Sequence, residues 1–202
     1  MILRNVVVLL GITVLLGCSE NVVQPQHTAS ESAAKTERMV PIKWDYLMQA
    51  VVPPNPGPAD FIICQIPSPP SPAPMDMPVA KNWTAQGIMT HLGKLDEASS
   101  SATFSSCTFG MYEGHPALVG GLDAIMVGAN GDALELSGSL TLTMGLGPDG
   151  PYPLASYGDF DIIGGSGRFH GASGWMDAVE EVTPDGARGI GLGMVTPPGR
   201  LH

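Results

Sequence analysis

The sequence predicts an all-β protein, built as an antiparallel sandwich or barrel behind a flexible N-terminal segment. Three observations support this fold class. Glycine and proline account for 26 and 19 of the 202 residues, too many for a helical bundle. From residue 87 onward, apolar segments of strand length alternate with turn sequences. Several of these segments alternate apolar and polar residues, which is the period of a strand with one buried face.

Residues 1–17 have the proportions of a secretory signal. Arg4 precedes an apolar run over residues 6–16, which is shorter than the ~20 residues that a bilayer-spanning helix needs. The run ends in Leu-Leu-Gly-Cys at Cys18 and resembles the lipobox of bacterial lipoprotein precursors. In those precursors the cysteine thiol receives a diacylglycerol, cleavage occurs just before it, and the new amino terminus is acylated.

This resemblance implies a lipidated Cys18 and attachment to a membrane of the bacterial envelope, since several acyl chains anchor a protein firmly. Ser19, in place of aspartate, follows the cysteine and favours the outer membrane by similarity to enteric lipoproteins. The alternative is an ordinary signal peptide with an incidental cysteine.

Residues 18–37 are polar and small, and we expect a flexible tether that leads into one domain over residues 38–202. At the start of that domain, four apolar or aromatic residues of one parity predict a half-buried strand: Val40, Ile42, Trp44 and Tyr46. Residues 46–52 could also form two turns of helix.

Residues 53–78 hold ten of the nineteen prolines. Because proline can neither donate to a strand ladder nor continue a helix, we expect this proline-rich insertion to lack ordinary regular structure. The apolar hexamer from Phe61 to Ile66 inside it should form a short strand, with extended segments on both sides.

Export would place the remaining cysteines, Cys64 and Cys107, in an oxidising compartment, where an even pair predicts a disulfide. The bridge would close a loop of about forty residues and stabilise the fold by ~3–4 kcal/mol. Two buried free thiols are the alternative. No metal site is expected, because neither cysteine has a second ligand at metal spacing and the five histidines are isolated in sequence.

The clearest strand covers residues 133–144, where leucine and methionine take one face and glutamate, serine and threonine the other. Residues 152–163 and 175–182 repeat this pattern less strictly. Turn sequences separate the segments, among them Asn-Gly-Asp at residues 130–132, and Asn-Gly between apolar runs is a strong hairpin signal. Strands with one clean apolar face favour an antiparallel sandwich or barrel over a parallel sheet.

Residues 162–175 read IIGGSGRFHGASGW, and this segment resembles the GGTGRFxGATG turn of the allene oxide cyclase barrel and dirigent families. An earlier segment, Gly87-x-x-Thr90-His91-Leu92-Gly93, adds to a likeness that covers roughly residues 88–196. Both families are antiparallel β-barrels of eight strands, so the resemblance implies that fold here. Relatives of this fold often associate, which implies a homo-oligomer such as a trimer.

The turn has a physical explanation that needs no function. Six residues are expected to shape it: Gly164, Gly165, Gly167, Phe169, Gly171 and Gly174. The first three glycines permit positive φ where the strand reverses. The phenylalanine can plug one end of the barrel, and Gly171 with Ala172 permits close approach of two backbones. A strand rather than a helix follows, which excludes a dinucleotide-binding fingerprint.

Function is less determined than fold. The formal net charge of −10, with nine lysines and arginines, excludes the basic patch that nucleic acid requires. Asp159 and Asp161 share a strand face with Tyr157 and could line a polar cavity as weak catalytic candidates. Phe160 and Ile162 supply a core face opposite, which favours solvent exposure of the two carboxylates instead.

We therefore predict a lipid-anchored envelope barrel that binds a small apolar ligand in its lumen, or a protein partner of the envelope, without a cofactor. A barrel of eight strands has room for packed side chains or for one small ligand. One alternative is a cofactor-free isomerase or cyclase that uses lumenal carboxylates such as Asp159 or Asp161. A second alternative is a structural or oligomeric surface module. An enzyme is less favoured than a binding protein.

Overall fold

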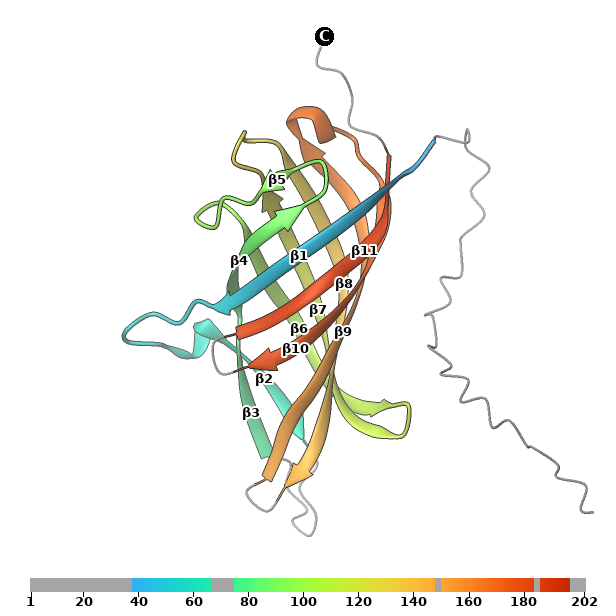
Figure 1. Ribbon diagram of the computed structural model, residues 1–202. Helices are drawn as coiled ribbons and strands as arrows, with labels where there is room; N and C mark the ends of the chain where they lie inside the picture. Colours follow the sequence, from blue (N-terminus) through green and yellow to red (C-terminus); the bar gives the residue numbers. More distant parts are fainter. Residues whose placement is uncertain (1–37, 67–74, 148–149, 184–185, 197–202) are drawn as a thin grey trace, which may run out of the picture. The chain divides into compact units, whose positions relative to one another are not determined.

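The computed structural model describes residues 38–66, 75–147, 150–183 and 186–196. Eight strands of this part close a ring by backbone pairing, in the order β1, β11, β10, β9, β8, β7, β6, β4 and back to β1, and every pair is antiparallel (Figure 1). The ring strands are β1 (Val40–Ala50), β4 (Asn82–Met89), β6 (Ser101–Tyr112), β7 (His115–Val127), β8 (Ala133–Gly147), β9 (Gly150–Ser166), β10 (Gly174–Thr183) and β11 (Gly186–Val195). The predicted eight-stranded antiparallel barrel is confirmed.

Three short strands lie outside the ring. β5 (Gly93–Lys94) pairs with the end of β4, while β2 (Phe61–Ile66) and β3 (Met75–Ala80) form a separate two-stranded hairpin. Two 3-10 turns, η1 (Pro58–Asp60) and η2 (Gly167–Phe169), precede β2 and follow β9. Within the described residues, no helix is long and apolar enough to cross a membrane.

β1 shows how local pattern becomes barrel wall. Alternate residues point inward and are buried, while Lys43 and Asp45 between them are exposed. The inward residues are Ile42, Trp44, Tyr46 and Met48. The helical alternative for residues 46–52 is wrong, because the strand continues to Ala50 with pairing to β11 and β4 on its two edges.

The proline-rich insertion contains more regular structure than expected. The predicted strand from Phe61 to Ile66 is present as β2, but its partner β3 was not predicted. Pro78 lies in β3 opposite Ile63, in a sheet of only two strands, where a missing backbone donor is tolerated. The signal segment, Cys18, the tether and the second extended flank, residues 67–74, lie outside the described residues.

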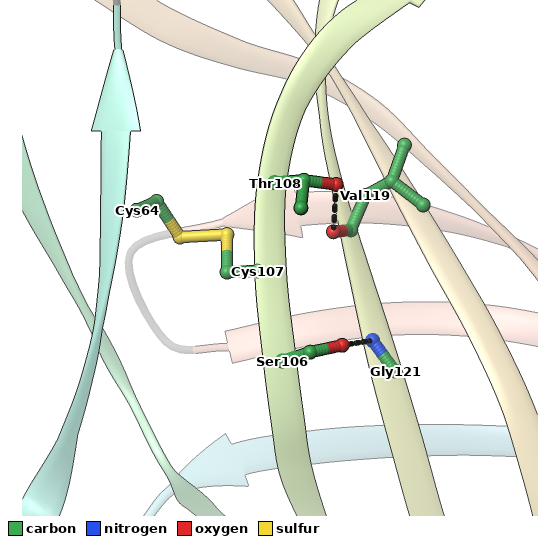
Figure 2. Close-up of a disulfide and its surroundings, with 6 residues drawn as sticks. All are labelled: Cys64, Ser106, Cys107, Thr108, Val119 and Gly121. Carbon is green, nitrogen blue, oxygen red and sulfur yellow. Dashed lines mark hydrogen bonds between the residues drawn. A yellow bond between two sulfur atoms is a disulfide. The ribbon is translucent and has the colours of Figure 1, made fainter.

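The ring is weakest between β4 and β6, where the register contains three residue pairs, from Asn82↔Thr103 to Thr84↔Ser101. Farther along β6, the hairpin of β2 and β3 lies against this strand without joining its ladder. The predicted disulfide joins them: Cys64 of β2 is bonded to Cys107 of β6, with a Cα–Cα distance of 5.3 Å (Figure 2).

The barrel interior has two parts. One part is filled by large side chains that are fully buried, namely Met89, Met126, Leu134, Phe169 and Met176. The other part lies next to the hairpin, where a smaller cluster contains Cys64, Ile66, Leu118 and Met144. Among the described residues, five methionines, Met48, Met89, Met126, Met144 and Met176, are buried on the inner face and serve as core filling, whereas Met111 is exposed.

The glycine turn closes the filled part, but not all of its residues act as expected. Gly167 and Gly171 have φ of 62° and 72°, and Phe169 is buried as a plug. The prediction of positive φ at Gly164 and Gly165 is wrong, because both residues have extended backbone within β9. Gly165 is required for space, because a Cβ there would collide with the Ala133 carbonyl.

Gly171 was expected to permit close approach of two backbones, and the structure shows a different role. A Cβ at this position would meet nothing within 4 Å, so close backbone approach is not its role. Its left-handed backbone is what favours glycine. At Gly174, which begins β10, a Cβ would collide with the Met194 carbonyl.

Candidate functional site in the barrel lumen

One level of the barrel carries a row of polar residues on its inner face. Strand register aligns Tyr46 of β1 with Gly189 of β11, Gly189 with Glu180 of β10, and Glu180 with Ser156 of β9. Leu142 of β8 continues the row opposite Ser156. Glu180 and Ser156 are buried, so the sheet brings a carboxyl and a hydroxyl side by side inside an otherwise apolar lumen.

Tyr46 and Glu180 are joined directly. Tyr46 Oη donates a hydrogen bond of 2.6 Å to Glu180 Oε1. The bond passes over Gly189, where a Cβ would lie only 2.8 Å from both Tyr46 Oη and Glu180 Cγ. The absence of a side chain at Gly189 therefore makes room for this contact.

Burial controls the ionisation of both groups. The side chain of Glu180 is 4% exposed, and desolvation raises its pKa; the hydroxyls of Tyr46 and Ser156 oppose this rise. Desolvation also raises the pKa of Tyr46, and the charge of Glu180 together with their hydrogen bond adds to that rise. Burial therefore shifts the ionisation of Glu180 to higher pH than that of an exposed glutamate.

A cavity of about 90 Å³ lies beside Glu180. Its wall is mainly apolar and comes from the hairpin and from the ring strands β4 and β6 to β11. The residues are Ile62, Val79, Trp83, Phe104, Ser106, Cys107, Leu118, Gly120, Leu140, Leu142, Ser156, Glu180, Val182 and Ala187. The lumen is thus packed toward the glycine turn and contains a small cavity on the side of the hairpin.

Ser156 Oγ is buried on this cavity and makes no hydrogen bond of normal geometry within the described part of the chain. Trp44 Nε1 is also buried without a hydrogen-bond partner among the described residues. The Trp44 ring stacks on Tyr46, with ring centroids 3.7 Å apart. Buried polar atoms are normally hydrogen-bonded, so unsatisfied atoms at a cavity indicate a place for a polar ligand atom.

A second polar cluster lies at the glycine turn. Arg168 Nε donates to Asp132 Oδ2, and its backbone N–H donates to Asp132 Oδ1 at 3.1 Å. Arg168 Nη2 also donates to the carbonyl of His91 at 3.0 Å. The guanidinium holds the pKa of Asp132 below its usual range. These hydrogen bonds from Arg168 to Asp132 and His91 fasten three loops together at the filled end of the barrel.

The sequence-predicted catalytic candidates are not in the lumen. Tyr157, Asp159 and Asp161 lie on the outer face of β9 and are exposed, while Phe160 and Ile162 point inward. The alternative in which the two carboxylates line the barrel is wrong, because strand alternation puts them on the face opposite the core. Tyr157 instead stacks on Tyr112 of the β6–β7 hairpin, with ring centroids 5.6 Å apart.

The functional residues that sequence reasoning missed are Glu180, Ser156 and Tyr46. Glu180 precedes Glu181, and nothing in the pair shows which residue faces inward until the register with β9 and β11 is known. The one available signal was parity, since Met176 and Ala178 share a face with Glu180. Across the described residues, no group of three or more potential metal-ligating side chains occurs.

Comparison with known proteins adds little beyond the fold. No protein-family model matches the chain, and no curated protein matches it either. Among solved structures, a pterocarpan synthase dirigent protein is similar over 85% of this chain and 92% of its own, with 16% identity and a TM-score of 0.41. Such a distant likeness says nothing about activity, so the chemistry of the site has to be argued from its own residues.

Proposed function

We propose that the barrel binds a small, mainly apolar ligand in the cavity beside Glu180. The observation that supports this proposal is a cavity with apolar walls and two buried polar groups, Glu180 and Ser156, at one place on them. Small-molecule sites have this composition, in which an apolar wall provides affinity and a few polar groups fix orientation. The hairpin of β2 and β3 forms part of the cavity wall.

The ligand is small. A cavity of about 90 Å³ is below the ~150 Å³ of an engineered protein cavity that accepts benzene. A larger molecule would require displacement of the hairpin, which contributes Ile62 and Val79 to the wall.

The proposal extends to location. The lipobox-like sequence before Cys18 supports a lipid anchor, and a disulfide between Cys64 and Cys107 is typical of proteins in an oxidising compartment. The barrel would then be held at the bacterial envelope. If Ser19 acts as a sorting signal as in enteric lipoproteins, the membrane would be the outer one. Replacing Cys18 with alanine should release the protein from the membrane fraction; retention there would contradict the anchor.

A second candidate function is proton transfer within the lumen, because Glu180 is buried, has a raised pKa and accepts a hydrogen bond from Tyr46. A carboxyl group of this kind can act as a general acid. It replaces Asp159 and Asp161 as the residue on which a cofactor-free isomerase would depend.

Native mass spectrometry of the protein isolated from its own host tests the binding proposal. We expect a co-purifying small molecule on the wild type and its loss in Ala187→Leu, which places a larger side chain on the cavity wall. The matched control is Ala98→Leu at an exposed loop position. A molecule retained equally by both variants, or absent from the wild type, would contradict the proposal.

A further inference from the structure

The polar atoms on the cavity wall are acceptors or can act as acceptors. Glu180 presents a carboxyl group and Ser156 an unpartnered hydroxyl. Ser106 Oγ is already used, since it accepts the backbone N–H of Gly121 at 3.0 Å (Figure 2). The indole N–H of Trp83 is also used, because it donates to the Ala80 carbonyl at 2.8 Å. Once Glu180 is ionised, its carboxylate only accepts and Ser156 can accept as well, so a ligand that carries several hydrogen-bond donors satisfies both groups.

Any charge on the cavity wall is negative. Among the described residues that line the cavity, none is a lysine, arginine or histidine, and Cys107 is held in the disulfide. Glu180 is the ionisable group that remains, and Tyr46 of β1 is the titratable residue that contacts it. An anionic ligand would be buried without a positive partner. A cationic ligand would instead pair with the carboxylate of Glu180.

Two aromatic rings form part of the same wall. Trp83 and Phe104 lie edge to face with centroids 6.2 Å apart, and both contact the cavity. Aromatic faces attract cations, and more strongly where water is excluded. The volume of about 90 Å³ leaves space only for a short alkyl group.

We propose that the cavity binds a short-chain primary ammonium ion, with its nitrogen donating to Glu180 and Ser156 and its alkyl chain against the apolar wall. This inference rests on the proposed binding function and names the ligand class for that site. A primary ammonium group has three donors, and Glu180 and Ser156 together supply acceptors for them. Charge-assisted hydrogen bonds of this kind are the stronger ones.

The proton balance follows from the state of the empty site. Because desolvation raises the pKa of Glu180, formation of the ammonium–carboxylate pair displaces a proton to solvent wherever the empty site still holds it on this carboxyl. The residues that face Glu180 across the cavity, from the hairpin and from β4, β6, β7, β8, β9 and β11, have no titratable side chain, and Tyr46 keeps its proton. Affinity should therefore rise with pH until Glu180 ionises without ligand.

Isothermal titration calorimetry with three ligands of similar size tests the inference: n-butylammonium, n-butanol and butyrate. With the full-length protein as purified at pH 8, we expect n-butylammonium to bind about tenfold or more tightly than n-butanol, and butyrate not to bind. Repeating the titration at several pH values, in buffers of different ionisation enthalpy, should show proton release with the ammonium ion that is larger at lower pH, and none with the alcohol.

Glu180→Gln should remove the preference for n-butylammonium while binding of n-butanol persists. Glu181→Gln is the matched control, because this neighbouring glutamate is exposed on the outer face. Equal or tighter binding of n-butanol, binding of butyrate, or the same loss in both variants would overturn the inference.

Failure of the inference and failure of the proposed function give different results. If a co-purifying molecule depends on the cavity but n-butylammonium does not displace it, the ammonium class is wrong and the binding function stands. If none of the three ligands binds and no molecule co-purifies, both are wrong.

Discussion

Tyr46 and Glu180 are hydrogen-bonded across a strand that separates them. The two residues lie on β1 and β10, and β11 runs between these strands with Gly189 at the same level. The hydroxyl spans this glycine to reach the carboxyl. Because the contact joins the first ring strand to one near the end of the chain, it contributes to both barrel closure and the candidate site.

Tyr46→Phe should destabilise the fold by about 1–3 kcal/mol, because it leaves a buried carboxyl without its donor. Urea unfolding measures this change. Tyr157→Phe on the outer face is the control and should have little effect. Equal stability of Tyr46→Phe and the wild type would mean that the hydrogen bond contributes nothing.

Glu180→Gln should change how stability depends on pH. A raised pKa in the folded state means that the contribution of protonated Glu180 is fully present below the unfolded value of about 4.3 and is lost as pH rises through the folded pKa. The wild type should therefore lose stability relative to Glu180→Gln as pH rises above about 4.3, up to the folded-state pKa of Glu180. Thermal unfolding across this range measures the difference, and parallel curves for the two proteins would refute it.

Asp132→Asn should weaken the loop fastening at neutral pH and have less effect in acid. The pKa of Asp132 is lowered by the hydrogen bond from Arg168, so its contribution is present above the unfolded value of about 3.9 and is lost as pH falls through the folded pKa. Chemical unfolding at pH 7 and pH 3 tests this dependence. An effect of the same size at both values would contradict it.

Gly167→Ala should destabilise the same turn by about 1–2 kcal/mol, the cost of a left-handed backbone for a residue with a Cβ. Contact between that Cβ and Asp132 Oδ1 would add to the cost. Gly171→Ala is a matched comparison, because Gly171 has a similar φ but open space around it. Denaturation should show a larger loss at Gly167 than at Gly171; the reverse order would show that the steric contact is unimportant.

Removing the disulfide with Cys64→Ser and Cys107→Ser should cost ~3–4 kcal/mol and loosen the hairpin before the ring. The hairpin is held to β6 by this bond and by apolar packing, without a shared ladder. Hydrogen exchange should accelerate in β2 and β3 while β9, β10 and β11 stay protected. A destabilised control with an intact bridge, Ile162→Ala, should not show this selective change.

Much of the barrel could be predicted because strand alternation is local. β1 and β8 were recognisable from their own residues, and the glycine turn marked the end of β9. β3 was missed because Pro78 argues against a strand, and its pairing with β2 depends on a long-range contact. Cys64 and Cys107 could be paired without coordinates because only two cysteines remained after Cys18.

The site could not be predicted in the same way. Asp159 and Asp161 are candidates from the sequence because they share a strand face, but the structure shows that this is the outer face. The lumenal position of Glu180 follows from the strand register, which pairs it with Ser156 on one side and Gly189 on the other. Lumenal position depends on pairing across four strands, and no single segment encodes it.

Carbon-13 NMR of the side-chain carboxyls measures whether burial raises the pKa of Glu180, on which the proposed site depends. The resonance that disappears in Glu180→Gln identifies this residue. We expect this carboxyl to titrate clearly above the ordinary glutamate value of about 4.3, and its resonance to shift when a ligand occupies the lumen. Titration at or below that value, with no response to ligand, would contradict it.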